Sequence, residues 1–222
     1  TGVMHVANGS VKIVGNATIT ENEAATIGAL YVQNKFDVTG DLLLDKNAAT
    51  GSTTVETTTI TRVYDEEGEL VSEETTESTT EVTHDGADFG AAYVGGVMLV
   101  GGNATITNNT ANNDIGAVYA GSLSVDGTLL VTDNSVTNNY GALKLNGSLN
   151  AMGDATFDNN TAGGMVGALS AYNATIDGAA TFTNNTAGTN FGALRLSGAL
   201  AIGGGHPAGQ QGGASWRAHR GG

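Results

Sequence analysis

The sequence of 222 residues contains no cysteine and only one proline, and 5% of its residues are aromatic. Without cysteine the chain can form no disulfide, no thiolate metal site and no cysteine nucleophile. No run approaches ~18 consecutive apolar residues, so we expect no transmembrane helix. The first residues show neither a basic stretch nor an apolar core. We therefore expect no targeting segment here.

Positive charge is also scarce. Eight Lys and Arg stand against 22 Asp and Glu, which gives a formal net charge of −14. Nucleic acids and anionic membranes select Lys and Arg, so this balance disfavours binding to either of them. With no long apolar run, we also expect no membrane insertion by this chain. The charge is uneven along the chain: residues 51–88 hold eleven acidic residues and one basic residue, a net charge of −10, while all other residues together carry −4.

Glycine, in contrast, is abundant, with 34 residues, and much of it belongs to a repeat. A Gly-Ala-apolar step recurs six times, at a period of about 25 residues that is broken by a single longer interval between Gly28 and Gly90. Gly2-Val3 lies one further period before the first copy and resembles a degenerate one. The glycines of the six steps are Gly28, Gly90, Gly116, Gly141, Gly167 and Gly192.

A second motif, an apolar residue followed three positions later by Asn, keeps the same period. Its asparagines also have one long interval, between Asn47 and Asn109, and it falls in the same part of the chain. Two motifs with one period and one common exception indicate a true structural repeat. The asparagines are Asn22, Asn47, Asn109, Asn134, Asn160 and Asn185.

Each repeat unit contains short apolar alternations of period two, separated by Gly, Asn and Asp. In the unit from Gly141 to Val166, for example, Leu143 and Leu145 alternate with Lys144. This pattern is typical of strands, and no segment shows a sustained helical stripe. We predict an all-β chain over residues 1–205: a right-handed parallel β-helix (solenoid) of about seven coils of ~25 residues.

The composition fits such a coil. The apolar residues of the second motif should stack as an interior ladder, with the asparagines at one corner bonding backbone groups of neighbouring coils. Glycine and asparagine are expected to supply the left-handed backbone of sharp corners. The predicted ladder comprises Ile19, Leu44, Ile106, Val131, Phe157 and Phe182.

The long interval corresponds to an insertion at residues 51–88. Its flanks are rich in Thr and Val, and its centre reads Asp65-Glu66-Glu67-Gly68. We predict a projecting, acidic, Thr-rich β-hairpin, with a disordered acidic loop as the alternative. Residues 206–222, which contain Pro207 and Trp216, follow the end of the repeat and are expected to form a flexible tail.

The two motifs resemble the repeats of the chlamydial polymorphic membrane proteins, which are Phe-x-x-Asn and Gly-Gly-Ala-Ile/Leu/Val. Phe157–Asn160 and Phe182–Asn185 match the first motif, whereas the residue before each Gly-Ala step is not glycine. The resemblance covers most of residues 2–205. It implies an autotransporter-like β-helical passenger of a bacterial surface protein, secreted, anchored in the outer membrane through a barrel outside this chain, and acting mainly as an adhesin.

Other functions are compatible with the same fold. Polysaccharide lyases and hydrolases share it, but the acids outside the insertion are scattered, and Lys144 and Arg195 are the only Lys or Arg between position 63 and the tail. Outward Thr-x-Thr pairs such as Thr18/Thr20 suggest ice binding, but the Thr row is broken. His84, Asp85 and Asp88 could bind a cation or be ordinary loop residues. The scattered acids are Asp37, Asp41, Asp45, Asp126, Asp133, Asp154, Asp158 and Asp177.

We therefore expect a non-enzymatic extracellular rod that presents a binding surface on its insertion, with no catalytic residue, cofactor or resident metal. The expected partner is a surface protein or glycan of a host or neighbouring cell, most simply a basic one, or a divalent cation. End-to-end self-association through the coil edges is also possible. The candidate binding residues are Glu56, Arg62, Tyr64, Asp65, Glu66, Glu67, Glu69, Glu73 and Glu74.

Overall fold

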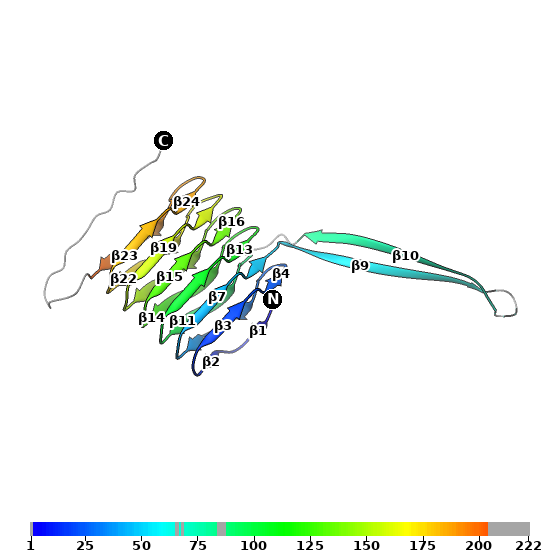
Figure 1. Cartoon of the computed structure of the whole chain (residues 1–222), viewed down its shortest axis with the longest axis horizontal. Coiled ribbons are helices and arrows are strands. Elements are labelled where there is room, and N and C mark those ends of the chain that lie inside the picture. The colour runs from blue at the N-terminus through cyan, green and yellow to red at the C-terminus, as the bar shows by residue number, and fades with distance from the viewer. Residues whose placement is uncertain (1, 65–66, 68, 84–87, 204–222) are drawn as a thin grey trace.

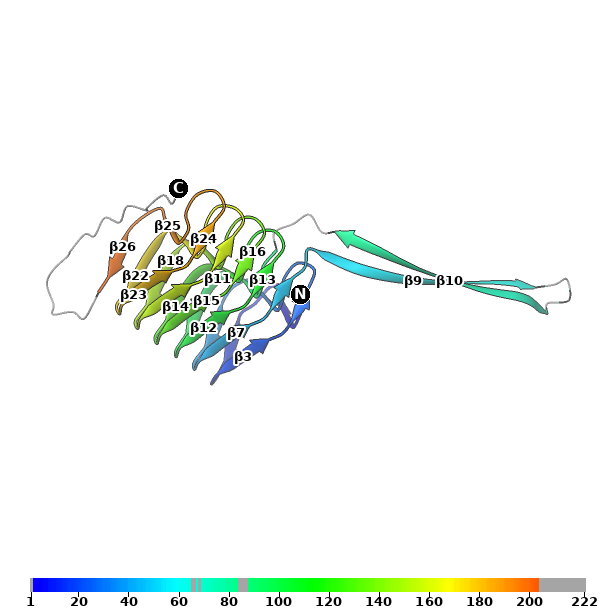
Figure 2. The same ribbon diagram turned by 45° about the horizontal axis from the view of Figure 1, so that its top comes forward.

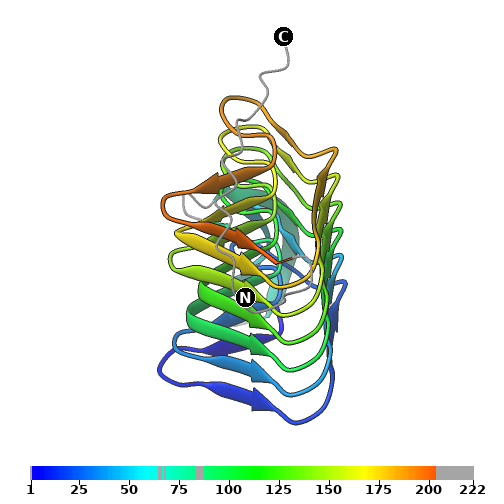
Figure 3. The same cartoon turned by 90° about the vertical axis from the view of Figure 1, so that its left-hand side faces the viewer.

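A computed structural model of the chain describes residues 2–64, 67, 69–83 and 88–203. These residues form an all-β solenoid of about seven turns whose equivalent positions are about 25 residues apart, as the repeat predicts. Seen end-on, the coils lie almost directly over one another (Figure 3). The long interval is occupied by a two-stranded ribbon that leaves the solenoid and returns to it (Figure 1).

The largest face of the solenoid is a parallel sheet of twelve strands, two from most coils. Its first row comprises β1 (Met4–Val6), β5 (Leu30–Val32), β11 (Ala92–Val100), β14 (Val118–Val125), β17 (Leu143–Leu145), β21 (Leu169–Ala171) and β25 (Leu194–Leu196). Alongside it lie β2 (Val11–Ile13), β6 (Phe36–Val38), β18 (Ser148–Ala151), β22 (Asn173–Ile176) and β26 (Leu200–Ile202). Strands β11 and β14 continue through both rows.

Two further parallel sheets of six strands complete the coil. The second sheet comprises β3 (Ala17–Thr20), β7 (Leu42–Asp45), β12 (Ala104–Thr107), β15 (Leu129–Thr132), β19 (Ala155–Asp158) and β23 (Ala180–Thr183). The third comprises the short strands β4 (Glu23–Ala24), β8 (Ala48–Ala49), β13 (Thr110–Ala111), β16 (Ser135–Val136), β20 (Thr161–Ala162) and β24 (Thr186–Ala187).

Apolar side chains fill the interior at matching positions of successive coils. The predicted ladder is confirmed, because Ile19, Leu44, Ile106, Val131, Phe157 and Phe182 are register partners in the second sheet. The rings of Phe157 and Phe182 stack with centroids 4.8 Å apart and planes 1° from parallel. Alanines of the first five Gly-Ala steps are buried, with Ala91 and Ala117 fully inaccessible, whereas Ala193 of the last coil is half-buried. The narrow interior therefore needs few aromatic residues.

The repeated asparagines form a second ladder, at the corner between the second and third sheets. Asn47, Asn109, Asn134 and Asn160 are completely buried. Each side-chain oxygen accepts both the backbone N–H and the amide N–H of the asparagine one coil earlier, as between Asn109 and Asn134, at 3.0 Å for both bonds. Each amide also donates to a backbone carbonyl, such as that of Ile106 for Asn134. The predicted corner role is confirmed.

The repeated glycines have a different role from the expected one. Among the described glycines only Gly15 and Gly51 have positive φ, so the glycines of the Gly-Ala steps are not left-handed corner residues. They are required because coils approach closely there: a Cβ on Gly116 would lie 1.8 Å from the carbonyl oxygen of Gly141. The left-handed corner falls instead on the residue before each ladder asparagine, where φ is 52–57°. These residues are Glu21, Lys46, Asn108, Asp133, Asn159 and Asn184.

The residue before each Gly-Ala step also has a structural purpose. Ile27, Phe89, Ile115, Tyr140 and Val166 form a buried cluster separate from the main core. Isolated parallel bridges join these residues from coil to coil, and the last bridge continues to Phe191. This position is therefore apolar where the resembled repeat has glycine.

Candidate functional site

The insertion is a long antiparallel hairpin, as predicted. Its strands are β9 (Ser52–Tyr64) and β10 (Leu70–Thr83), paired from Ser52 opposite Thr83 to Tyr64 opposite Leu70, with one irregularity between Leu70 and Ser72. In both Figure 1 and Figure 2 the ribbon extends away from the solenoid, and neither view places the coils against its length. The hairpin therefore presents both of its faces to the surroundings.

The base of the hairpin shows how the insertion fits into the coil. After β8 the chain stays hydrogen-bonded to the preceding coil as far as Gly51, whose N–H donates to the carbonyl of Ala25 and whose φ of 71° begins the departure. The coil resumes at the buried Asp88, whose backbone oxygen accepts the N–H of Ile115. In the next coil Asn113 and Asp114 occupy the equivalent places, so residues 52–87 are the inserted segment. His84 and Asp85, the suggested cation ligands beside Asp88, lie outside the described residues.

The candidate binding residues are spread along the ribbon. Arg62 and Glu73 face each other across it and form an ion pair of 2.6 Å, with 48% and 42% of their side-chain surface exposed. Glu74 lies opposite Thr61, and Glu56 is paired in the backbone register with Thr79. Tyr64 lies at the far end, while Glu67 and Glu69 lie beyond it in the connection. Asp65 and Glu66 fall outside the described residues.

Large apolar side chains are exposed towards the far half of the hairpin. Ile60, Tyr64, Leu70 and Val71 each keep between 49% and 64% of their surface accessible. Exposed apolar groups framed by charged residues are typical of surfaces that bind another macromolecule. Of these four residues, only Tyr64 is among the candidate binding residues expected from the sequence, although Ile60, Leu70 and Val71 also lie in segments whose composition favours strands.

Most of the scattered acids of the solenoid act as hydrogen-bond acceptors between coils. Asp41 caps the backbone N–H of Asn103 at 2.7 Å, and Asp154 caps that of Ala179 at 2.8 Å. Asp158 accepts from both Thr183 and Asn184. Similar contacts hold Asp45 to Asn108, Asp133 to Asn159 and Asp114 to Asn139, and Asp37 pairs with Lys35. Apart from Asp37, whose partner lies in its own coil, these carboxylates hold coils together, and these contacts form no general acid and base pair.

The shared repeat position of Asp45 and Asp158 is confirmed by the register, which joins them through Thr107 and Thr132. The same row holds Thr20 and Thr183 at its ends, so the outward Thr row is interrupted by two aspartates as the sequence indicates. A flat, uninterrupted threonine face is thus missing from this sheet.

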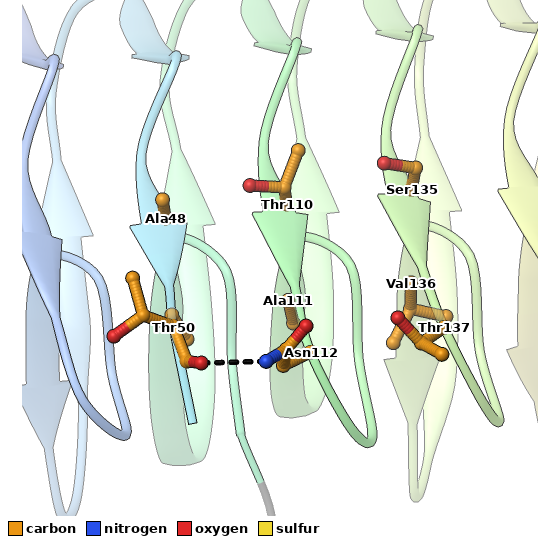
Figure 4. A pocket seen from close by; sticks show the side chains of 9 residues that line it. Ala48, Thr50, Thr110, Ala111, Asn112, Ser135, Val136 and Thr137 are labelled. Carbon is orange, nitrogen blue, oxygen red and sulfur yellow. Dashed lines mark hydrogen bonds between the residues drawn. The ribbon is translucent and has the colours of Figure 1, made fainter. Parts of the chain in front are cut away.

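A shallow groove of about 530 Å³ lies beside the base of the hairpin (Figure 4). It crosses β8, β13 and β16 and is lined by Ala48, Ala49, Thr50, Thr110, Ala111, Asn112, Ser135, Val136 and Thr137. The amide of Asn112 is already used, since it donates to the backbone oxygen of Thr50 at 2.6 Å. The lining carries hydroxyls, one amide and methyl groups, and none of its residues has an acidic or basic side chain.

The solenoid also carries an external row of aromatic rings that is not among the features predicted from the sequence. On the outer face of the twelve-stranded sheet, His5, Tyr31, Tyr93 and Tyr119 are register partners. Their rings stack in turn, with centroids 4.6, 5.0 and 4.9 Å apart and planes within 11° of parallel. The signal was present, because Tyr is the fourth residue of three Gly-Ala-apolar-Tyr sequences. The Gly-Ala-apolar repeat ends at the third residue and so does not include this tyrosine.

The aromatic row continues into a cationic one. Lys144 is the register partner of Tyr119, and Ser170 and then Arg195 occupy the same position in the next two coils. The ammonium of Lys144 lies 4.2 Å from the ring centre of Tyr140, a cation–π distance. In the described part of the chain, neither basic residue forms an ion pair with a carboxylate. The aromatic part of this row, from His5 to Tyr119, strengthens contacts between successive coils, because stacked rings cover one another's faces.

One group on this face has a shifted pKa. Burial raises the pKa of the Tyr93 hydroxyl above its ordinary value, and the neighbouring hydroxyls of Tyr119 and Tyr31 raise it further once they are charged. The hydroxyl of Tyr31 donates to the side-chain oxygen of Gln33 at 2.5 Å, and Asn146 donates to that of Tyr119. The Tyr93 hydroxyl is thus neutral near pH 7 and supplies no base there.

Within the described ranges, no group of three or more His, Cys, Asp or Glu is arranged to hold a metal ion. Nor does the described part of the chain contain a helix of the length and apolarity that crossing a membrane requires.

Comparison with known proteins adds no assignment: no family model, no curated protein and no solved structure matches this chain.

Proposed function

We propose that this chain is a non-enzymatic, extracellular passenger domain of the autotransporter type, an adhesin-like rod whose hairpin is the contact element. One observation carries the proposal: the β9–β10 ribbon projects from the solenoid. Its strands of 13 and 14 residues extend away from the coils and are not packed along them. An isolated two-stranded ribbon is at best marginally stable in water. A ribbon of this length is favoured when a partner covers it.

The solenoid provides the support that such an element needs. Its coils are joined by parallel sheets, a buried apolar interior and a continuous asparagine ladder. A rigid scaffold with an irregular projection is the common arrangement for displaying a binding segment. The coil also resumes at Asp88 in register with the following one, so the insertion leaves the repeat undisturbed.

The chemistry of the hairpin indicates the class of partner. Residues 51–88 carry a net charge of −10, and the exposed apolar groups Ile60, Tyr64, Leu70 and Val71 lie among these charges. Acidic surfaces attract basic partners over distances of about 8 Å at physiological salt. We therefore propose a basic surface protein of a host or neighbouring cell as the partner.

The experiment compares the full chain with a variant that lacks residues 52–87, which joins Gly51 directly to Asp88. We expect this variant to keep the far-ultraviolet circular dichroism of the folded solenoid and the thermal midpoint of the full chain. The reason is that Gly51 joined to Asp88 follows the same backbone path as Asn113 and Asp114 in the next coil. Binding of the fluorescently labelled protein to intact animal and bacterial cells, measured by flow cytometry, should be lost.

A matched variant keeps the hairpin but replaces Tyr64, Leu70 and Val71 with serine. It should retain the ribbon charge and lose most of the cell binding, which separates apolar contact from long-range attraction. Cell binding that survives the deletion of residues 52–87 at full strength would disprove the role of the hairpin.

A further inference from the structure

The two edges of the hairpin differ in charge. Strand β10 carries glutamate at positions 73, 74, 77 and 81 and no basic residue. Strand β9 carries one glutamate, Glu56, and one arginine, Arg62, and is otherwise built of Ser, Thr, Val, Ile and Tyr. One edge is therefore strongly acidic, while the other is neutral and rich in β-branched residues.

Each of these strands has one partner among the described residues, namely the other strand. Its second edge therefore carries a row of backbone N–H and C=O groups that no neighbouring strand pairs. Natural proteins protect such edges with charge, proline or covering elements. The four glutamates protect the edge of β10, but β9 has no proline and no net charge. Strand β9 is the edge that favours pairing.

We infer that the free edge of β9 pairs with β9 of a second copy of this chain. The strands run antiparallel about a two-fold axis at Thr59, and the product is a four-stranded sheet in the order β10–β9–β9–β10. This inference goes beyond the proposed function, because it names a second copy of the chain as a further partner of the hairpin, and it rests on that proposal only in treating the hairpin as a contact element.

The sequence of β9 specifies the register. Glu56 and Arg62 lie three positions on either side of Thr59. Antiparallel pairing centred on Thr59 places position 56 of each copy opposite position 62 of the other, so two opposite-charge pairs form. A shift to the adjacent allowed registers places Glu56 opposite Ile60 or Tyr64 instead. Parallel pairing would place like charges opposite each other.

The same alignment suits the remaining positions. It places Val55 opposite Val63 and Thr54 opposite Tyr64, so eleven residues of each strand overlap, about 37 Å at 3.4 Å per residue. Because β9 starts at the solenoid, antiparallel pairing puts the two solenoids at opposite ends of the new sheet. The outer edges are then the two acidic β10 strands, and their repulsion prevents further addition.

The first test is a charge exchange, read by sedimentation velocity and multi-angle light scattering of the full-length protein over a concentration series. The parent protein should dimerise. Glu56→Arg and Arg62→Glu should each weaken the dimer roughly ten- to hundredfold, because each creates two like-charge contacts. The double variant with both substitutions should restore the parent affinity.

Two controls make the result specific. Glu73→Gln removes the ion pair with Arg62 inside one hairpin and should leave the dimer intact, which separates dimer loss from weakening of the hairpin itself. Glu77→Arg changes charge on the protected strand and should also leave the β9 pairing intact. Monomers at every concentration, or a double variant no better than the single ones, would overturn the inference.

Disulfide trapping gives a second readout, and the absence of native cysteine makes it clean. Two copies of Thr59→Cys should cross-link rapidly under mild oxidation, since paired antiparallel Cα atoms lie within disulfide reach. Thr76→Cys, at the position opposite Thr59 in β10, should cross-link far more slowly. Equal rates would contradict the inference. Loss of dimer with retained cell binding refutes only this inference, whereas a dimer with no hairpin-dependent cell binding refutes only the proposed function.

Discussion

The side chain of Asn134 donates its amide N–H to the side-chain oxygen of Asn160 at 3.0 Å, and the same oxygen accepts the backbone N–H of Asn134 at 3.2 Å. The relationship recurs between successive coils from Asn22 to Asn185. One residue type thus satisfies the backbone and side-chain groups that a corner would otherwise leave unpaired in the interior.

Replacement of Asn134 by alanine should destabilise the solenoid by roughly 3 kcal/mol or more, because it removes donors to two carbonyls and the acceptor of Asn109 in a fully buried site. Asn22→Ala is the matched control. Asn22 is only half-buried at the first coil, and its replacement should cost about 1 kcal/mol. Urea unfolding followed by circular dichroism measures both. Equal costs would contradict the ladder as the source of the effect.

Replacement of Gly116 by alanine should be equally damaging for a steric reason. The new Cβ would lie 1.8 Å from the carbonyl oxygen of Gly141 and 2.8 Å from that of Ser135, and both are backbone atoms that cannot move separately. We expect a loss of about 3 kcal/mol, or failure to fold. In Gly9→Ala the Cβ meets only a side-chain methyl of Val6 at 3.2 Å, and stability should change by less than about 0.5 kcal/mol.

Replacement of Lys46 by asparagine should stabilise the protein. Lys46 has φ of 52°, in the left-handed region that asparagine tolerates better than lysine. Its ion pair with Glu21 is 3.5 Å long and largely exposed, so its loss costs little. We expect a gain of about 0.5–1 kcal/mol in the free energy of unfolding. Lys46→Ala removes the same charge without relieving the backbone and should show no gain.

The raised pKa of Tyr93 predicts a loss of stability in alkali. Below the ordinary tyrosine pKa of about 10 the hydroxyl is neutral in both folded and unfolded chains. Above it the unfolded chain ionises first while the folded chain keeps its proton, so the free energy of unfolding falls as pH rises. Tyr93→Phe should remove part of this fall between about pH 9 and about pH 11. Ultraviolet absorbance of tyrosinate and denaturant unfolding follow the two processes, and an unchanged slope would contradict the assignment.

The sequence predicted the solenoid because its period is carried by local requirements. A coil corner needs an asparagine, an interior position needs an apolar residue, and both recur at fixed distances. The hairpin could also be predicted, since Thr and Val flank an acidic turn within a single interruption. The role of the glycines could not, because the close approach between Gly28 and Gly90 joins coils on either side of the insertion. Only the φ values and the interatomic distances distinguish a glycine required by close approach of two coils from a glycine required by a left-handed turn.

The candidate site was predicted in part. The acidic composition identified the hairpin, but the asymmetry of its edges depends on which residues fall in β9 and which in β10, and on the register between them. The apolar residues Ile60, Leu70 and Val71 could not be recognised as exposed until the ribbon was seen to stand away from the coils. The stacking of Tyr31 on Tyr93 likewise required the insertion to be placed outside the coil.

The sequence by itself determined the period, the interior ladder, the asparagine corner and the position of the acidic insertion, because each follows from residue type at a fixed spacing. Tertiary structure alone decided what lies beside what. It turned scattered aspartates into acceptors between coils, made glycines the points of closest backbone approach, and stacked tyrosines that lie on opposite sides of the insertion in the sequence. The physical reason is that each residue of a solenoid contacts the equivalent residue of the next coil, which is normally about 25 positions away in the sequence. Across the insertion the same contact joins residues such as Tyr31 and Tyr93, which are much farther apart in the sequence.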